Sequence, residues 1–187
     1  MRVISGACRG KKLSAPAGVT TRPTSDRVKE ALFSILSSRM DFADIRVLDI
    51  CAGTGSLGIE ALSRGAKSCC FIECNPSVVS ILEKNIAVTC YHDRSMIMTM
   101  DAVKALSLLT ERGHNFDLVF FDPPYNSELY TRVPEAFISG SLLSPHSILV
   151  IECAARNHLS EGYGQLKRFD RRVYGETALE LFELEEG

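Results

Sequence analysis

The chain of 187 residues lacks the features that mark membrane, secreted and zinc-binding proteins. No apolar run approaches the roughly 18 residues that a membrane-spanning helix needs, and the first residues, MRVISGACRG, lack the apolar core of a signal peptide. The seven cysteines are odd in number and form no C-x-x-C pair, which argues against a disulfide framework and against a zinc site. We therefore expect reduced thiols, a cytoplasmic location, no metal and no membrane contact.

Positive charge is concentrated at one end of the chain, although the formal net charge is only −2. Residues 1–39 carry eight basic and two acidic side chains, and the remainder is acidic overall. A basic segment on an acidic body is typical of a protein that docks on a polyanion, whereas chance clustering on a solvated surface is the alternative. The basic residues expected to contact a polyanion are Arg2, Arg9, Lys11, Lys12 and Arg22.

The basic segment itself predicts a hairpin, a loop and a helix. Two short runs separated by a glycine-containing turn indicate a β-hairpin over residues 1–14, outside the main sheet. Residues 15–24 hold two prolines and predict an ordered loop that includes Arg22-Pro23-Thr24. A helix over residues 25–38 is expected to pack on the core through a periodic apolar stripe of Val28, Ala31, Leu32, Ile35 and Leu36. We treat residues 1–39 as one unit and residues 40–187 as the main domain.

The rest of the chain alternates strands with helices. Continuous apolar strands are expected over residues 46–51, 68–73, 95–100, 116–121 and 147–153. Helices are expected over residues 57–64, after Asn75-Pro76, over 102–109 and over about 128–139. This order is typical of a parallel sheet covered by helices on both faces. Residues 167–174 and 178–184 break the order and predict an antiparallel pair at one sheet edge.

The glycine-rich stretch Val47–Gly58, VLDICAGTGSLG, predicts a buried strand, a tight turn and the start of a helix. Its glycines match the G-x-G-x-x-G fingerprint of nucleotide-type binding loops. In that fingerprint the first glycine, here Gly53, makes the turn, Gly55 admits the ligand and Gly58 lets the helix pack on the strand. The pattern is weak on its own, because a glycine turn can be purely structural.

Acidic residues follow or end four of the predicted strands, where ligands bind in open parallel sheets. Glu73 is placed to bind ribose hydroxyls, and Asp101 is placed to meet an adenine edge. Asp49 would repel a diphosphate and favours a cationic cofactor, such as a nucleoside bearing a sulfonium. For each of these residues a helix cap or a strand-end position is the structural alternative.

The run Asp122-Pro123-Pro124-Tyr125 is the second specific signal. Two prolines fix the backbone, so the Asp122 carboxylate and the Pro123 carbonyl can both accept hydrogen bonds from one exocyclic amino group. Tyr125 offers a face on which a planar base can stack. The run is expected to orient an amino group that attacks a methyl carbon, and a strand-terminating turn is the alternative.

With these motifs the chain resembles the RsmD-type family of ribosomal RNA guanine-N2 methyltransferases. The matching stretches are MRVISGACRGKKL, RPTSDRVKEALFSIL, VLDICAGTGSLGIEALSRGA, FIECNPS and DPPY. The resemblance implies an α/β, Rossmann-like, seven-stranded and mostly parallel sheet with an antiparallel C-terminal pair and an N-terminal hairpin and helix. It implies 16S ribosomal RNA as the partner, either free or within an assembling small subunit.

The same resemblance implies S-adenosyl-L-methionine as the cofactor. The residues expected to contact it are Asp49, Cys51, Ala52, Gly53, Gly55, Glu73, Asp101, Ala102 and Thr24. The target amino group is expected at Asp122, Pro123, Pro124 and Tyr125, and the hairpin and the Arg22-Pro23-Thr24 loop are expected to face RNA or close over the cofactor.

Other functions remain open at the level of sequence. An NAD-dependent oxidoreductase would share the glycine loop and Glu73 but does not explain the DPPY run. A non-catalytic RNA-binding module would not need the DPPY acceptors. DNA adenine and protein glutamine are alternative substrates, because the motif recognises an amino group of any owner. An alternative RNA surface is the C-terminal basic cluster of Lys167, Arg168, Arg171 and Arg172.

Overall fold

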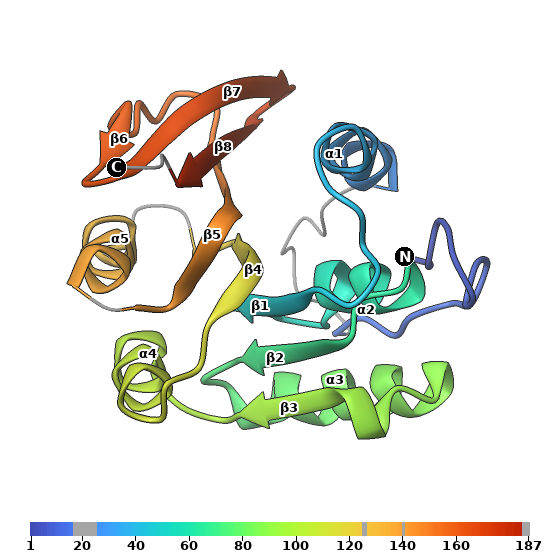
Figure 1. Cartoon of the computed structure of the whole chain (residues 1–187). Coiled ribbons are helices and arrows are strands. Elements are labelled where there is room, and N and C mark those ends of the chain that lie inside the picture. Colours follow the sequence, from blue (N-terminus) through green and yellow to red (C-terminus); the bar gives the residue numbers. More distant parts are fainter. Residues whose placement is uncertain (17–25, 125–126, 140, 185–187) are drawn as a thin grey trace.

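The alternating strands and helices form one mixed sheet covered on both faces, as the sequence predicts (Figure 1). The computed structural model describes residues 1–16, 26–124, 127–139 and 141–184. Within these ranges the sheet has eight strands in the order β3-β2-β1-β4-β5-β8-β7-β6. The strands are β1 (Arg46–Ile50), β2 (Ser68–Ile72), β3 (Ser95–Met98), β4 (Phe116–Phe121), β5 (Leu143–Ala154), β6 (Gly162–Tyr163), β7 (Leu166–Tyr174) and β8 (Thr177–Leu184).

Strands β1 to β5 are parallel, and the C-terminal strands run antiparallel, as expected. The sheet differs from the expected seven strands by the two-residue strand β6, which pairs with β7 at the edge. Strand β5 also begins earlier than expected, because an irregularity in the β4–β5 register lets Leu143 pair with Phe116 ahead of Pro145. Both additions are short or irregular, and neither produces a periodic apolar pattern in the sequence.

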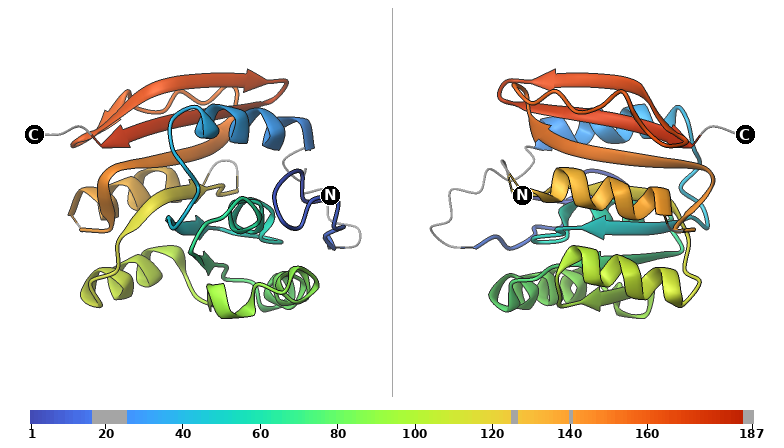
Figure 2. Two further views of the ribbon diagram at one scale, coloured as in Figure 1. Left: turned by 45° about the vertical axis from the view of Figure 1, so that its right-hand side comes forward. Right: turned by 90° about the vertical axis from the view of Figure 1, so that its left-hand side faces the viewer.

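The helices divide the core into two layers. The helices α1 (Asp26–Ser37), α2 (Ser56–Ser63) and α3 (Pro76–Thr89) contribute to one apolar cluster, and α4 (Ala102–Glu111) and α5 (Leu129–Ser139) contribute to the other. A short 3₁₀ helix, His92–Arg94, precedes β3. Figure 2 shows α1 alongside the C-terminal strands, where the Arg39 guanidinium lies 4.1 Å from the centre of the Phe169 ring. None of the described helices is long and apolar enough to cross a membrane.

Helix α1 packs on the core through the predicted stripe, and its buried face is wider than expected. Val28, Leu32 and Leu36 are buried, and Ala31 and Ile35 are half-buried, with Ile35 packed against the core cluster. Lys29 and Phe33 are also fully buried. The sequence analysis counted Lys29 only as one of the basic residues of this segment, whereas in the fold a buried carboxylate is available to it.

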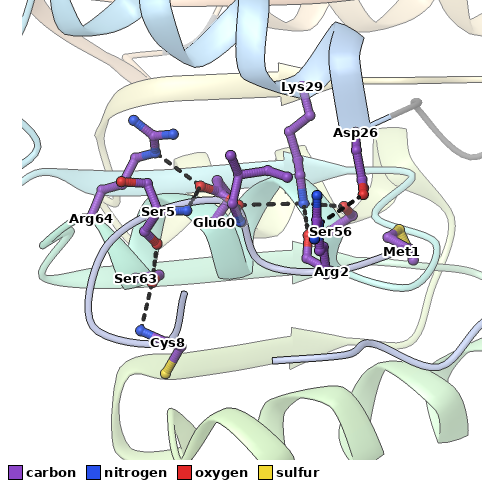
Figure 3. A network of polar contacts seen from close by, with 12 residues as sticks. Met1, Arg2, Ser5, Cys8, Asp26, Lys29, Ser56, Glu60, Ser63 and Arg64 are labelled. Carbon is purple, nitrogen blue, oxygen red and sulfur yellow. Dashed lines mark hydrogen bonds and ion pairs between the residues drawn. The ribbon is translucent and has the colours of Figure 1, made fainter. Parts of the chain in front are cut away.

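That carboxylate belongs to Glu60 in α2, and it holds α1 against the helix that follows the glycine loop (Figure 3). The Lys29 ammonium lies 3.3 Å from Glu60 Oε2, and both side chains are completely buried. The Lys29 Nζ also donates to the Arg2 carbonyl at 2.6 Å and to Ser56 Oγ at 3.2 Å. Burial lowers the pKa of Lys29, and Glu60 opposes that effect. A buried charge pair with so many hydrogen bonds fixes the position of α1.

The N-terminal hairpin is held by the same carboxylate. The Ile4 amide donates to Glu60 Oε2 at 2.7 Å, and the Ser5 amide donates to Oε1 at 2.9 Å. The two ends of the segment pair through a single antiparallel bridge between Arg2 and Lys12, outside the main sheet as expected. The expected hairpin is therefore present in reduced form, because its backbone bonds with α2 replace a longer ladder.

We predict that Glu60→Ala lowers the free energy of unfolding by about 3 to 5 kcal/mol, because Lys29 loses its carboxylate and two buried amides lose their acceptor. Urea denaturation at pH 7 measures the effect. Glu183→Ala is the control, since Glu183 pairs with Arg39 at a half-exposed site and should matter by about 1 kcal/mol or less. Equal effects of the two substitutions would contradict a structural role for Glu60.

Candidate functional site

The order in which the chain adds strands to the sheet reverses between β1 and β4, and the carboxyl ends of these parallel strands lie side by side there. The chain proceeds outward from β1 to β2 and β3, then returns to place β4 on the other side of β1. Ligands bind in open α/β sheets at such a switch point. The glycine loop follows β1 here, Glu73 follows β2 and Asp122 follows β4. The topology therefore brings together three of the sequence motifs that were singled out independently.

The glycine loop contains three left-handed backbone positions within five residues. Cys51, Gly53 and Gly55 have φ angles of 59°, 56° and 78°. A side chain at Gly53 would meet only the Cys51 carbonyl oxygen, at 3.9 Å, whereas one at Gly55 would lie 2.3 Å from Leu82. The space beside Gly53 is therefore open, and Gly55 is the position where α3 passes close to the loop. Which of the two glycines lies against a ligand stays a prediction.

The third glycine has the role that the fingerprint predicts. A side chain at Gly58 would lie 2.4 Å from Phe71 and 2.6 Å from the Cys69 sulfur, both in β2. Gly58 therefore allows α2 to pack closely against β2. Ala52 is half-buried, and its amide donates to the Ile72 carbonyl at 2.9 Å, which ties the loop to the end of β2.

Asp49 lies beneath the glycine loop and caps the helix that follows it. The residue is only 2% exposed, and its Oδ2 accepts a hydrogen bond from the Gly58 amide at 2.9 Å. That amide is one of the donors that a helix leaves unpaired at its N-terminus. Burial raises the pKa of Asp49 to about 7; the Gly58 hydrogen bond opposes the rise and Glu73 adds to it. A positive charge nearby would favour the ionised form.

Glu73 joins the glycine loop to the start of α3. Its Oε2 accepts from the Gly53 amide at 3.0 Å, and its Oε1 accepts from the Asn75 amide at 2.9 Å. Asn75 in turn caps α3 through Ser77. The carboxylate therefore borders the open space at Gly53, and each of its oxygens has a further lone pair for a ligand hydroxyl.

Asp101 lies farther along the same edge and is exposed. It caps α4, with Oδ1 accepting from the Lys104 amide at 3.1 Å, and it is followed by the buried Ala102. Strand β3 ends at Met98, so Asp101 comes from the connection to α4 and not from the strand itself. Asp101 and Asp49 therefore both cap helices, which is the structural alternative to ligand binding. This role does not prevent a carboxylate oxygen from also binding a ligand.

Asp122 and Pro123 extend β4 beside the glycine loop. The Asp122 amide donates to the Ile50 carbonyl at 3.3 Å, which places it directly against the end of β1. Burial raises the pKa of Asp122 well above its usual range, and the charges of Glu152 and Asp49 raise it further. The Pro123 carbonyl lies 3.4 Å from the Tyr130 hydroxyl of α5. Pro124 is exposed, and Tyr125 lies outside the described residues.

The field of this edge is negative. Burial raises the pKa of the Cys51 thiol far above its usual range, and the acidic groups that reinforce the effect include Glu73, Asp122 and Asp49. The same arrangement disfavours a diphosphate and favours a cation. Among the described residues, no group of three or more His, Cys, Asp or Glu side chains could hold a metal ion.

The N-terminal hairpin runs along α2 away from this edge. At its ends, Met1 Sδ accepts from the Thr54 hydroxyl at 3.8 Å, and Asn85 binds both Ser14 and the Thr54 carbonyl. At its tip, the Cys8 amide donates to Ser63 Oγ at 2.9 Å, at the far end of α2. Asn85, like Lys29, was missed by the sequence analysis. Its only signal is a polar residue on an otherwise apolar helix face.

The basic side chains of the N-terminal segment differ in their freedom to contact a polyanion. Arg9 and Lys12 are exposed, and Arg2 is exposed although it lies 3.3 Å from Asp26. The Lys11 Nζ donates to the Val88 carbonyl at 2.7 Å. Lys29 is buried and cannot contribute to a docking surface, so the surface charge is lower than the sequence count suggests. Arg22 and Thr24 lie outside the described residues.

The alternative C-terminal basic cluster is largely occupied by internal contacts. Arg168 and Arg171 lie 3.0 and 2.7 Å from the carboxylate of the fully buried Glu180, and Arg172 lies 3.0 Å from Asp170. Arg171 also donates to the Ala155 carbonyl at 2.8 Å. The pairs with Glu180 join β7 to β8, and the Arg172–Asp170 pair lies within β7, so the cluster is less suited to binding phosphates than the sequence suggests.

Comparison with known proteins agrees with this geometry. A model of the family described as conserved hypothetical protein 95 matches residues 1–183. Ribosomal RNA small subunit methyltransferase D of Escherichia coli K12 is 31% identical over 185 residues, which cover 99% of this chain and 90% of that protein. The protein of the same name from Haemophilus influenzae is 35% identical over 153 residues, which cover 81% and 78%.

Solved structures show the same fold. A hypothetical protein of Thermus thermophilus superimposes with a TM-score of 0.85 at 29% identity, covering 98% of this chain and 99% of that one. A more distant structure, solved in complex with SAH, has a TM-score of 0.69 at 12% identity and covers 84% of this chain and 48% of that one. The second likeness concerns the fold alone.

The raised pKa of Asp49 predicts how stability depends on pH. The folded-state pKa of about 7 lies above the ordinary value of 3.8, so the folded protein holds this proton more tightly and loses stability as the pH rises from about 4 to about 7. Asp49→Asn keeps an acceptor for Gly58 and cannot ionise. We expect it to be more stable than the parent at pH 8, by up to about 4 kcal/mol, and similar at pH 4. Urea denaturation across this range tests it, and a pH-independent difference would contradict the assignment.

Proposed function

The chain belongs to the family of conserved hypothetical protein 95, the RsmD type of ribosomal RNA methyltransferases, and from that membership we propose a specific reaction. The protein transfers a methyl group from S-adenosyl-L-methionine to the exocyclic N2 amino group of a guanine in 16S ribosomal RNA. The substrate is this RNA, either free or within an assembling small subunit, in the cytoplasm. The observation that carries this proposal is the adjacency of Asp122 and the Pro123 carbonyl to the glycine loop.

The edge of the sheet fits S-adenosylmethionine better than a dinucleotide. The open space at Gly53 admits a ligand close to the backbone, and Glu73 borders that space with oxygens that can accept ribose hydroxyls. Glu73 and Asp49 give the edge a negative field. The bound cofactor supplies a methyl group on a positively charged sulfur. An NAD-dependent oxidoreductase would instead place a diphosphate above Asp49, which opposes it.

The chain's own acceptors explain selectivity for an amino group. The lone pair of an exocyclic amine is delocalised into the ring, so the nitrogen must be oriented to react. The Asp122 carboxylate and the Pro123 carbonyl can accept its two hydrogens, and Tyr130 holds the carbonyl by its hydroxyl. A raised pKa suits Asp122 to receive the amino proton. Pro124 and Tyr125 complete the proposed target site, with Tyr125 stacking on the base.

RNA docking is assigned to the basic N-terminal segment. A base reaches a buried methyl donor only when it is unpaired or flipped out, and phosphate contacts then hold it in place. Met1, at one end of the hairpin, contacts Thr54 of the glycine loop, and Arg2 pairs with Lys12, which supports a role for these two residues in docking RNA near the loop. Arg9 follows Cys8 at the tip of the hairpin, and the Lys11 ammonium reaches the Val88 carbonyl near the end of α3, so both would contact more distant phosphates. Arg22 is proposed to contact the RNA as well.

We predict that Asp122→Ala reduces kcat for methyl transfer to small ribosomal subunits on the order of 100-fold or more, because one preorganised acceptor is removed. The affinity for S-adenosylmethionine, measured by calorimetry, should stay nearly unchanged. Tritiated methyl transfer followed by nucleoside analysis gives the rate and identifies the methylated base. Asp93→Ala, an exposed aspartate before β3, is the control. Full activity of the Asp122 variant, or a product other than N2-methylguanosine, would refute the proposal.

A second prediction concerns the exposed cations of the hairpin. Replacing Arg9 and Lys12 together by alanine should weaken RNA binding and reduce its salt dependence, by about 0.7 to 0.9 in log–log slope for each phosphate that the protein no longer neutralises. Filter binding at several salt concentrations measures the slope. The matched control replaces the exposed Lys67 and Arg112 by alanine. If both double variants keep the parent slope, the hairpin does not bind RNA.

A further inference from the structure

A second carboxylate lies beside Asp122 at the end of the neighbouring strand. Strands β4 and β5 are parallel, and Phe121 pairs with Ile151, so Asp122 and Glu152 are lateral neighbours. Phe120 and Val150 belong to the apolar cluster beneath α1, α2 and α3. Because side chains alternate along a strand, Asp122 and Glu152 extend that same face. Glu152 is only 5% exposed.

The backbones of the two strand ends are linked through α5. The Tyr130 hydroxyl lies 3.1 Å from the Glu152 carbonyl oxygen and 3.4 Å from the Pro123 carbonyl oxygen. The Tyr130 ring packs against Phe121, with centroids 6.0 Å apart. One side chain of α5 therefore lies against the backbones of both strand ends that carry the two carboxyl groups.

The Glu152 carboxylate also interacts electrostatically with Asp122. Its charge adds to the effect of burial and raises the pKa of Asp122. Two neighbouring acids at a ligand-binding edge resist ionising together until hydrogen-bond donors approach them.

We propose that Glu152 is a specificity residue, which accepts a hydrogen bond from N1–H of the target guanine while Asp122 accepts from its N2 amino group. This inference rests on the proposed function and deepens it. Guanine presents two adjacent donors on this edge, whereas adenine presents an amino donor beside an N1 acceptor. A carboxylate facing N1 therefore attracts guanine and repels adenine. Together, Glu152 and Asp122 recognise the two adjacent donors of guanine. Asp122 alone could not distinguish the amino group of guanine from that of adenine.

The test replaces the base as well as the residue. 2-Aminopurine keeps the 2-amino group of guanine but has an N1 acceptor without a hydrogen. Small subunits are reconstituted with RNA that carries guanosine or 2-aminopurine riboside at the mapped target nucleotide, and tritiated methyl transfer to each is measured. In Glu152→Gln the amide can donate to N1 of 2-aminopurine. We expect the ratio of kcat/KM for guanine over 2-aminopurine to fall by roughly 10- to 100-fold.

2-Aminopurine also lacks the O6 oxygen of guanine. This loss affects the parent and the variant alike, so it cancels when their two kcat/KM ratios are compared. Glu111→Gln, with the same charge change at the far end of α4, should keep the parent ratio. Calorimetry with S-adenosylmethionine and a thermal melt show that each variant is folded. If Glu152→Gln does not fold, Glu152→Asp is used; it should lower guanine turnover at least about 10-fold with unchanged cofactor affinity.

The outcomes separate the two proposals. If the parent protein does not methylate guanine N2, the proposed function fails. If it does, but Glu152→Gln leaves the base ratio unchanged, or Glu152→Asp keeps full turnover when it is the variant tested, the role of Glu152 fails alone. A parent that methylates 2-aminopurine as well as guanine would also overturn it.

Discussion

The buried carboxylate of Glu60 joins parts of the chain that no apolar contact alone would hold in register. It accepts hydrogen bonds from the Ile4 and Ser5 amides and pairs with Lys29 and Arg64. A buried charge with this number of donors has one arrangement of low energy, because any displacement leaves a charged or polar group unpaired. The N-terminal hairpin and α1 therefore have fixed positions relative to α2, whose N-terminus forms part of the cofactor edge. The segment proposed to dock RNA is in this way tied to the proposed site of methyl transfer.

The edge of the sheet that is proposed to bind the cofactor is acidic, in contrast to the basic N-terminal segment. Asp49, Glu73, Asp122 and Glu152 gather there, and the pKa values of Asp49 and Asp122 are raised by burial and by their acidic neighbours. Such an arrangement costs stability in the empty protein and is relieved by a cation or by hydrogen-bond donors. The buried Glu60 and Glu180, which lie elsewhere in the core, pair with Lys29 and Arg64 and with Arg168 and Arg171.

Several carboxylates have structural roles that are compatible with ligand binding. Asp49 caps α2, Asp101 caps α4, and Glu73 binds the amides of Gly53 and Asn75. These bonds orient each carboxylate before any ligand arrives, which reduces the entropy lost on binding. A residue identified as a helix cap is therefore not excluded from the site. The cap is the means by which it is positioned.

The strand–helix alternation, the strand-to-helix turn at the glycine loop and the antiparallel C-terminal pair could be predicted from the sequence, because local periodicity and turn chemistry encode them. The burial of Lys29 and Phe33 in α1 and the short strand β6 could not. The contacts of Lys29 with Glu60 and of Arg168 and Arg171 with Glu180, and the position of Glu152 beside Asp122, arise only in the folded protein. Each depends on strand order and on how helices pack on the sheet, so residues distant in sequence become neighbours, and no local pattern records which polar side chain will find a buried partner.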